Sequence, residues 1–426
     1  MFLLSFIKRF FINLEKKRNE YFYFIQSVIS SIIFIFIGKS INLVIFGSKH
    51  GSSYSDNSRY LFEWINSNRP EINCIWLTKN GEIIKMLESS GLSCLNMFSL
   101  RGKIALKRAT VGVISHSLRD IAPSPLDVPK SIKLIQLFHG QCVKAVRFGM
   151  NEGFENNNQA SERRLEAKLI SYAISTSDFM SELWEKCMEF GRNKHITTGY
   201  PRNDCLLNVP EMHVNNWNKS MNIENCDNLI LYAPTYRPGN NATEFFPFSD
   251  FDIDLLIEIL NRTRSNLLLR PHLTDLFRYN KLKNFLEELA TNERIQLATH
   301  DQFVDVNIIL PFIDILITDY SSIFHDFLLL DRPMIFVPYD YDHYRQRSGF
   351  LYDYFENLPG PYVTDFNQFS EELRKTLNDR SYYVEKRVML KEKIHEYTDS
   401  SSCERVSHLV EDLLEENFRY QGLLFQ

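Results

Sequence analysis

The chain has 426 residues, of which 44% are hydrophobic and 24% charged, as in folded globular proteins and unlike disordered ones. This length favours two domains over one, and the net charge of −5 argues against a dedicated nucleic-acid binder, which usually carries a basic domain. Seven scattered cysteines without a C-x-x-C pair indicate a reducing compartment and provide no metal framework.

The N-terminal segment 1–40 differs in composition from the rest of the chain. Residues 1–20 carry five basic and two acidic side chains among Phe, Leu and Ile, and residues 22–37 carry no charge. A membrane-spanning helix needs about 20 apolar residues, and no small-residue cleavage site follows that would indicate a signal peptide. We expect an amphipathic helix on an anionic membrane surface or a helix packed under the first sheet, with a true span as a third alternative.

Short apolar segments alternate with helical patterns along the rest of the chain. A first series of buried strands is predicted at 41–47, 72–78, 110–116, 132–140, 171–177 and 195–201. After a polar stretch, a second series is predicted at 228–235, 266–272, 295–300, 314–322, 333–340 and 361–365. Alternation of this kind is typical of parallel sheets that are covered by helices on both faces.

Two such series predict an α/β protein with two doubly wound parallel-sheet domains that face a cleft. Following the segment 1–40, we expect an N-terminal domain at 41–205, a linker at 206–227, a C-terminal domain at 228–400 and a last helix at 401–426.

The sequence "DYSS" at 319–322 joins a predicted strand to a predicted helix. Ligands of open parallel sheets bind beyond the carboxyl ends of the strands, and free backbone N–H groups at a helix start attract anions. Ser321 and Ser322 fall at the expected N-cap, so the segment predicts a phosphate site. No G-x-G-x-x-G loop, complete P-loop, G-x-S-x-G elbow or His-x-x-x-His pair occurs in the sequence.

Several motifs, taken together and in order, resemble those of the CDP-glycerol glycerophosphotransferases. They are "SKHGSSYSDNSRYLFEWI" (48–65), the "HG" and lysine of 139–144, "GYPRND" (199–204), "YAPTYR" (232–237), "RPH" (270–272), "TDYSSIFHDF" (318–327) and the segment 333–361. Enzymes of that family prime and polymerise teichoic acids and related capsule polymers. The resemblance covers about residues 41–400.

This resemblance implies a GT-B-like fold that moves glycerol phosphate, or another polyol phosphate, from a CDP-activated donor to an acceptor hydroxyl and releases CMP. It implies no cofactor and no fixed metal. His139 and His272 match the catalytic histidines of the family. The expected donor-binding residues are Ser321, Ser322, Arg237, Thr235, Arg270, Asp319 and Asp340, and the expected acceptor-side residues are Gly140, Lys144, His116 and Asn57.

The chemistry of these residue types suits the transfer. A histidine with an ordinary pKa of about 6.5 can take the proton of an attacking hydroxyl, and arginine can neutralise charge on the phosphoryl group. We expect His139 and His272 to face one another across the cleft. Phe138, Gln141 and Cys142 depart from the family pattern beside His139, which leaves the acceptor open.

The expected partners are CDP-glycerol or another CDP-polyol, a lipid-linked or polymeric acceptor, and the cytoplasmic face of the cell membrane as a peripheral surface. Nucleic acid is not expected. Two alternatives stay open at this point: a GT-B glycosyltransferase that uses a nucleotide sugar, and a catalytically idle scaffold in a polymer-assembly complex.

Overall fold

The computed structural model describes residues 25, 26, 28–30, 32, 38–150, 157–221, 223, 226–237 and 243–424. By their contacts, the residues form two compact units: unit 1 is Met1–His139, Ser161–Ile174 and Cys403–Gln426, and unit 2 is Gly140–Ala160 and Ser175–Ser402. Most of the predicted segment 1–40 lies outside the described residues. The domain bounds inferred from strand alternation stay a prediction.

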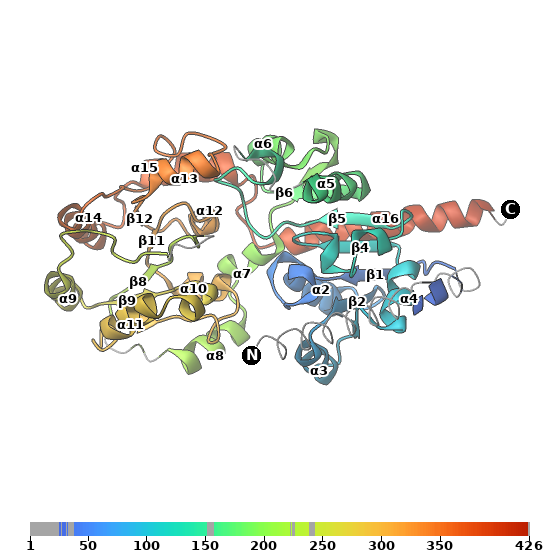
Figure 1. Ribbon diagram of the computed structural model, residues 1–426, viewed down its shortest axis with the longest axis horizontal. Helices are drawn as coiled ribbons and strands as arrows, with labels where there is room; N and C mark the ends of the chain where they lie inside the picture. Colours follow the sequence, from blue (N-terminus) through green and yellow to red (C-terminus); the bar gives the residue numbers. More distant parts are fainter. Residues whose placement is uncertain are drawn as a thin grey trace, which may run out of the picture. The chain divides into compact units, whose positions relative to one another are not determined.

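The first sheet has the strand order β3-β2-β1-β4-β5-β6-β7, and the neighbouring strands from β3 through to β6 pair in parallel (Figure 1). Its central strands β1 and β4 are buried along their whole length. They read as continuous apolar runs because helices cover both faces of a parallel sheet. The strands are β1 (Leu43–Phe46), β2 (Asn73–Thr78), β3 (Cys94–Asn96), β4 (Val111–Ile114), β5 (Lys133–Gln136), β6 (Ile170–Ser175) and β7 (His195–Thr197).

The second sheet is parallel throughout and has the order β10-β9-β8-β11-β12. In both sheets the first strand of the series lies inside, and the chain builds outward from it first on one side and then on the other. This is the doubly wound pattern, with a switch point between β1 and β4 and another between β8 and β11. The strands are β8 (Asn228–Tyr232), β9 (Ser265–Leu269), β10 (Ile295–Leu297), β11 (Ile315–Thr318) and β12 (Met334–Phe336).

The helices begin and end where local sequence signals allow. In α9, for example, Asp252 caps the first turn by accepting a hydrogen bond from the backbone N–H of Leu255 at 3.0 Å, and Leu256, Ile259 and Leu260 form the buried stripe. The α-helices are α2 (Asp56–Asn68), α3 (Gly81–Ser89), α4 (Leu100–Arg108), α5 (Asn157–Leu169), α6 (Asp178–Met188), α7 (Asp204–Leu207), α8 (Glu211–Ser220), α9 (Ile253–Arg262), α10 (Leu273–Arg278), α11 (Asn280–Leu289), α12 (Ile323–Phe327), α13 (Tyr341–Arg347), α14 (Phe366–Asn378), α15 (Val384–Ile394) and α16 (Ser402–Leu424). Among these residues no helix is both long and apolar enough to cross a bilayer.

The predicted α/β class with two doubly wound parallel sheets is confirmed, and two element predictions need correction. Strand β3 was missed, because three residues at a sheet edge, only one of them buried, give no apolar run. The strand predicted at 361–365 is wrong, since Tyr362 forms only an isolated parallel bridge to Phe336. The expected linker 206–227 contains helix α8.

Candidate active site

Polar side chains gather at both switch points, one in each unit. In unit 1 the loop after β1 carries Lys49 and His50, and the loop after β4 carries His116. In unit 2 the corresponding loops are 233–237 after β8 and 319–322 after β11. Open parallel sheets bind their ligands at these places, because adjacent loops turn in opposite directions there and leave a crevice.

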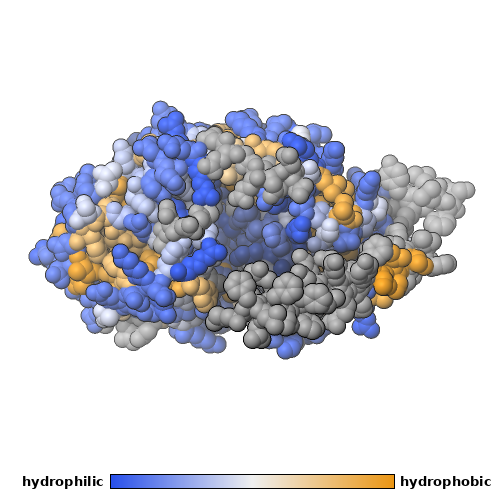
Figure 2. Space-filling view, in the orientation of Figure 1, coloured by the Kyte–Doolittle hydropathy of each residue, from blue (hydrophilic) through white to orange (hydrophobic). Residues whose placement is uncertain are grey.

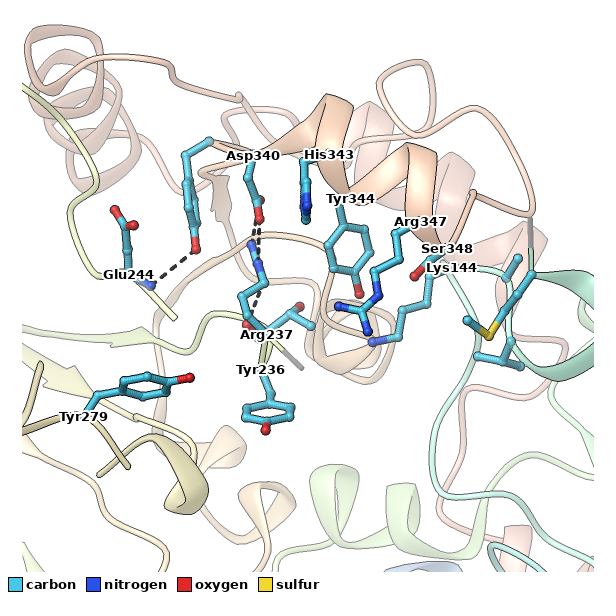
Figure 3. A pocket seen from close by; sticks show the side chains of 15 residues that line it. Lys144, Tyr236, Arg237, Glu244, Tyr279, Asp340, His343, Tyr344, Arg347 and Ser348 are labelled. Carbon is cyan, nitrogen blue, oxygen red and sulfur yellow. Dashed lines mark hydrogen bonds and ion pairs between the residues drawn. The ribbon is translucent and has the colours of Figure 1, made fainter. Parts of the chain in front are cut away.

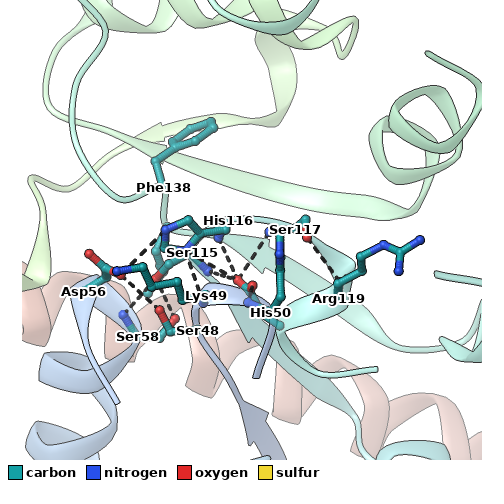
Figure 4. A network of polar contacts seen from close by, with 12 residues as sticks. Ser48, Lys49, His50, Asp56, Ser58, Ser115, His116, Ser117, Arg119 and Phe138 are labelled. Atoms are coloured by element: carbon teal, nitrogen blue, oxygen red, sulfur yellow. Dashed lines mark hydrogen bonds and ion pairs between the residues drawn. The ribbon is translucent and has the colours of Figure 1, made fainter. Parts of the chain in front are cut away.

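A network of polar contacts ties the two loops of unit 1 together (Figure 4). Asp120, which is fully buried, accepts hydrogen bonds from the backbone N–H groups of His50, Ser115, His116 and Ser117 at 2.7–3.3 Å. Burial raises the pKa of Asp120 to about 6 against the opposing effect of these donors. The four backbone donors favour the ionised carboxylate, which fixes the backbone that presents the histidines.

Three histidines lie next to one another in this part of unit 1. The rings of His116 and His139 are stacked, with centroids 4.2 Å apart and planes 4° from parallel, and the ring of His50 meets His116 edge-on at 6.5 Å. Nε2 of His116 lies 3.7 Å from a carboxylate oxygen of Asp56. The two predicted site residues His139 and His116 are thus in direct contact.

The backbone that carries His139 adopts an unusual conformation. Phe138 has a φ of 57°, in the left-handed region that costs a non-glycine residue energy. The buried amide of Asn57 donates to the carbonyl oxygens of Leu137 and Phe138 at 3.1 and 3.0 Å, which holds this turn. Asn57, predicted on the acceptor side, therefore supports the turn before His139.

Gly140 follows, in unit 2, with a φ of 150°. A Cβ at this position would lie 2.9 Å from Oγ of Ser322 and 3.2 Å from Nη2 of Arg202. Only glycine fits without displacing these groups. The structure thereby brings predicted residue Gly140 against predicted residue Ser322.

Arg237 is the centre of a polar network in unit 2. Its guanidinium forms a two-pronged ion pair with Asp340 at 2.7 and 2.8 Å, a further one with the buried Asp319 at 2.8 Å, and a hydrogen bond to the carbonyl oxygen of Thr235. The backbone N–H and hydroxyl of Thr235 donate to the same Asp319. Although burial opposes it, the two carboxylates raise the pKa of Arg237. Four predicted donor residues therefore form one cluster.

A pocket of about 740 Å³ opens beside this network (Figure 3). The ends of Lys144 and Arg347 point to the same place in it, beside the hydroxyl of Tyr344, and Nζ of Lys144 lies 5.8 Å from the centre of that ring. The segment of Lys144 is held there by a backbone hydrogen bond from Ala145 to Gly349. The lining residues are Lys144, Ala145, Val146, Met150, Thr235, Tyr236, Arg237, Glu244, Tyr279, Tyr339, Asp340, His343, Tyr344, Arg347 and Ser348.

The predicted catalytic residue His272 and the predicted donor residue Arg270 lie around the same network or have structural partners. His272 is exposed, packs against Tyr236 at 4.4 Å and caps α10 by accepting the N–H of Thr274. Arg270 donates to the carbonyl oxygens of Ala298 and Phe303, and burial lowers its pKa to about 10.

Ser321 and Ser322 are half-buried at the start of α12. Ser322 occupies the predicted N-cap position; its own side chain makes no capping hydrogen bond, whereas Oγ of Ser321 accepts one from the backbone N–H of Ile323 at 3.5 Å. Within the described residues, no group of three His, Cys, Asp or Glu side chains has a geometry that could hold a metal ion.

Sequence reasoning missed Asp56 and Asp120 as partners of the histidines, and Arg347, Tyr236 and Tyr279 in the pocket. Asp56, Tyr236 and Arg347 stand inside the quoted motifs, so a signal was present. Asp120 and Tyr279 lie outside every motif, and only the folded chain brings them to the site. The catalytic and binding roles of the predicted residues stay predictions.

Comparison with known proteins identifies the family. The model of the family described as CDP-Glycerol:Poly(glycerophosphate) glycerophosphotransferase matches residues 29–412. A teichoic acid glycerol-phosphate transferase of Staphylococcus aureus (strain NCTC 8325 / PS 47) is 27% identical, over 87% of this chain and 92% of its own length. A teichoic acid poly(glycerol phosphate) polymerase of Bacillus subtilis (strain 168) is 30% identical, over 78% of this chain and 43% of its own length.

The fold is found in a solved structure of the wall teichoic acid polymerase TagF, with a TM-score of 0.75 and 21% identity over 95% of this chain and 99% of that one. This likeness supports the GT-B-like fold with its two doubly wound sheets. Because the family model matches most of the sequence, the chain belongs to the CDP-glycerol:poly(glycerophosphate) glycerophosphotransferase family.

Proposed function

We propose that the protein transfers glycerol phosphate from CDP-glycerol to a hydroxyl group of a growing cell-surface polymer and releases CMP. Family membership supports the reaction class. The observation on which the proposal rests most is the pocket of unit 2, where Lys144 and Arg347 converge beside several tyrosines at a switch point. Two cations that point to one place favour an anion between them.

The pocket can take each part of the donor. The diphosphate of CDP-glycerol is an anion, for which Arg347 and Lys144, the latter expected on the acceptor side from the sequence, supply charge and hydrogen-bond donors. The rings of Tyr236 and Tyr279 give flat apolar surfaces on which a pyrimidine base can stack. The volume of about 740 Å³ is within the usual range for a ligand of this size.

In this proposal Arg237 is a structural residue of the pocket and not a direct phosphate ligand. Four of its five N–H groups donate to Asp340, Asp319 and the Thr235 carbonyl oxygen among the described residues. Such a guanidinium is a rigid part of the pocket wall, and it orders the loops after β8 and β11. Ser321 and Ser322, on the second of these loops, offer hydroxyl groups to the phosphates.

In the reaction, the acceptor oxygen attacks the phosphorus next to glycerol. The bond from this phosphorus to the bridging oxygen breaks, and CMP leaves with that oxygen. We assign to His139 the removal of the acceptor proton, because its ring is exposed and its backbone is held in a fixed, strained turn. We assign to His272 a contact with the donor phosphates, since it packs on Tyr236 of the pocket.

A peripheral position on the cytoplasmic face of the membrane is part of the proposal. Residues 25, 26, 28–30 and 32 are helical, and the exposed fractions of Ile25, Val28, Ile29 and Ile32 are 53%, 43%, 40% and 51%. This spacing puts all four on one helical face, and Figure 2 shows apolar atoms at the right of the view, where Figure 1 draws this stretch in dark blue. An exposed apolar face after a basic segment suits an anionic lipid surface.

The membrane proposal is tested by sedimentation with vesicles of phosphatidylglycerol and phosphatidylcholine. Replacing Ile25, Ile29 and Ile32 by serine should release the protein from the vesicles while its rate of CMP release on a soluble acceptor stays the same. Equal sedimentation of the variant and the natural chain would refute this anchor.

The transfer is tested by incubating the purified full chain with a polyol-phosphate acceptor and one of three donors: CDP-glycerol, CDP-ribitol or a UDP-sugar. Release of CMP from a CDP-polyol is expected, and release of a nucleoside diphosphate from a UDP-sugar would instead support a glycosyltransferase. Lys144→Ala should weaken donor binding by about tenfold to a hundredfold through the loss of one charge-assisted contact. Lys281→Ala, an exposed lysine of α11, is the matched control and should change nothing.

A further inference from the structure

We propose that Asp56 and His116 are positioning residues of the transfer reaction: they orient the imidazole of His139 and stabilise the positive charge that it gains with the acceptor proton. This inference rests on the proposed function and adds two residues to it. Neither side chain needs to touch the substrate, because both act through the ring of His139.

The first argument is the stack itself. The rings of His116 and His139 lie 4.2 Å apart and within 4° of parallel, so His116 covers one face of His139. The turn just before His139 is fixed by Asn57, whose side-chain amide donates a hydrogen bond to the carbonyl oxygen of Phe138. Ring and backbone of His139 are therefore both constrained, as a base must be to meet one particular hydroxyl.

The second argument concerns the protonation state of His116. The backbone N–H of Lys49 donates to Nδ1 of His116 at 3.3 Å, so this nitrogen is an acceptor and the ring proton lies on Nε2. Nε2 faces the carboxylate of Asp56 at 3.7 Å (Figure 4). A ring in this tautomer can present its electron-rich face to a cation.

The third argument is that Asp56 is itself held in place. The hydroxyl groups of Ser48 and Ser55 donate to the same carboxylate oxygen at 3.1 and 3.0 Å. The contacts thus run from the hydroxyl groups of the two serines to the Asp56 carboxylate, then to the ring of His116 and finally to the ring of His139. When His139 takes the proton of the acceptor, its new charge lies over the face of His116 and within the field of Asp56.

Other ionisable groups border this arrangement and are part of its pH dependence. Asp120 reaches within 3.9 Å of Nδ1 of His116. His50 lies edge-on at 6.5 Å, and burial lowers its pKa, with further lowering by Arg163, Lys79 and Arg119 against the opposing effect of Asp120. Among these groups, Asp56 is the carboxylate on the Nε2 side of His116, and its removal leaves the hydrogen bonds of Asp120 intact.

Variants of His116 test the contribution of the ring, and a variant of Asp56 tests the contribution of the charge. His116→Phe keeps a flat ring over His139, whereas His116→Ala removes it. We expect kcat to fall roughly tenfold or more in His116→Ala with an unchanged KM for CDP-glycerol, and His116→Phe to restore most of that loss. Asp56→Asn keeps an acceptor for both serines and removes the charge, so the acidic limb of the kcat profile should move to lower pH by about half a unit.

The control is His408→Asn, at an exposed histidine of α16 that is not one of these groups. Its pH profile should match that of the unchanged chain. Carbon-13 labelling of histidine and an assignment by His139→Asn give a second readout that needs no turnover: the titration of His139 by NMR should move to lower pH in Asp56→Asn.

Equal kcat in His116→Ala and the unchanged chain, or an unmoved His139 titration in Asp56→Asn, would overturn the positioning role and leave the proposed function standing. If the unchanged chain releases no CMP from CDP-glycerol, the proposed function fails instead. The NMR titration then still decides whether Asp56 acts on His139.

Discussion

Replacing Arg237 by methionine should destabilise unit 2 far more than removing its contact with the partly exposed Asp340. Arg237 is 7% exposed, and its partner Asp319 is 1% exposed, so the substitution leaves a buried carboxylate without its cation. Breaking a buried ion pair in this way costs about 3–5 kcal/mol. Asp340 is 21% exposed, so water can solvate it, and Asp340→Asn should cost only about 1 kcal/mol.

Urea unfolding of the full chain, followed by circular dichroism, measures both effects as shifts of the transition midpoint. The double variant Arg237→Met with Asp319→Asn should regain a large part of the loss, because it buries no uncompensated charge. If Arg237→Met costs no more than Asp340→Asn, or if the double variant is less stable than Arg237→Met, the assignment of Arg237 as the buried centre of the network is refuted.

Three further predictions follow from single residues. His395 is buried, and burial lowers its pKa to about 4, so the unfolded chain binds a proton between pH 6.5 and 4 that the folded chain does not. In urea unfolding, the natural chain should therefore lose about 3 kcal/mol of stability relative to His395→Gln as the pH falls through this window. A difference between the two chains that does not change with pH would contradict this. Gly140→Ala should lower both stability and donor affinity, since its Cβ would lie 2.9 Å from Oγ of Ser322. Thermal unfolding with and without CDP-glycerol checks this: the donor should raise the Tm of the variant less than that of the natural chain, and an equal rise would refute the prediction. Ser321→Ala with Ser322→Ala should weaken donor binding in calorimetry without a loss of stability above about 1 kcal/mol, because Ser322 makes no capping hydrogen bond; unchanged donor affinity would refute the phosphate role of both serines.

The parallel strands could be predicted from the sequence because a strand that is buried on both faces consists of consecutive apolar residues. The segments Leu43–Phe46 and Ile315–Thr318 are fully buried and stand out for that reason. Strand β3 is short and lies at an edge, so its residues carry little of this signal. At Tyr362, local pattern favoured a strand, but the folded chain pairs only one residue.

The site was only partly predictable, for a physical reason. The residue types at the strand ends identified Arg237, Asp319 and Asp340. The sequence does not indicate, however, that the two carboxylates accept hydrogen bonds from most of the N–H groups of the guanidinium. Lys144 lines the pocket of unit 2 because its segment pairs with Phe350, about 200 residues further along the chain. Such partners are set by packing and not by local spacing.

The stacking of His116 on His139 is another contact that could be predicted only in part from the sequence. The two residues belong to loops after different strands, β4 and β5, and adjacent parallel strands bring their carboxyl ends to one edge. Proximity of the loops could therefore be expected from the sequence. The parallel ring geometry and the hydrogen bond from Lys49 that fixes the tautomer required the folded chain.

The most direct test of the central claim follows the fate of the phosphorus next to glycerol. CDP-glycerol labelled with phosphorus-32 at this position is incubated with the full chain and a polyol-phosphate acceptor, and the products are separated by chromatography. The account predicts that the label enters the acceptor and that unlabelled CMP appears in equal amount, because the bond between this phosphorus and the bridging oxygen breaks. Label that leaves in CDP while glycerol alone is transferred would contradict phosphoryl transfer.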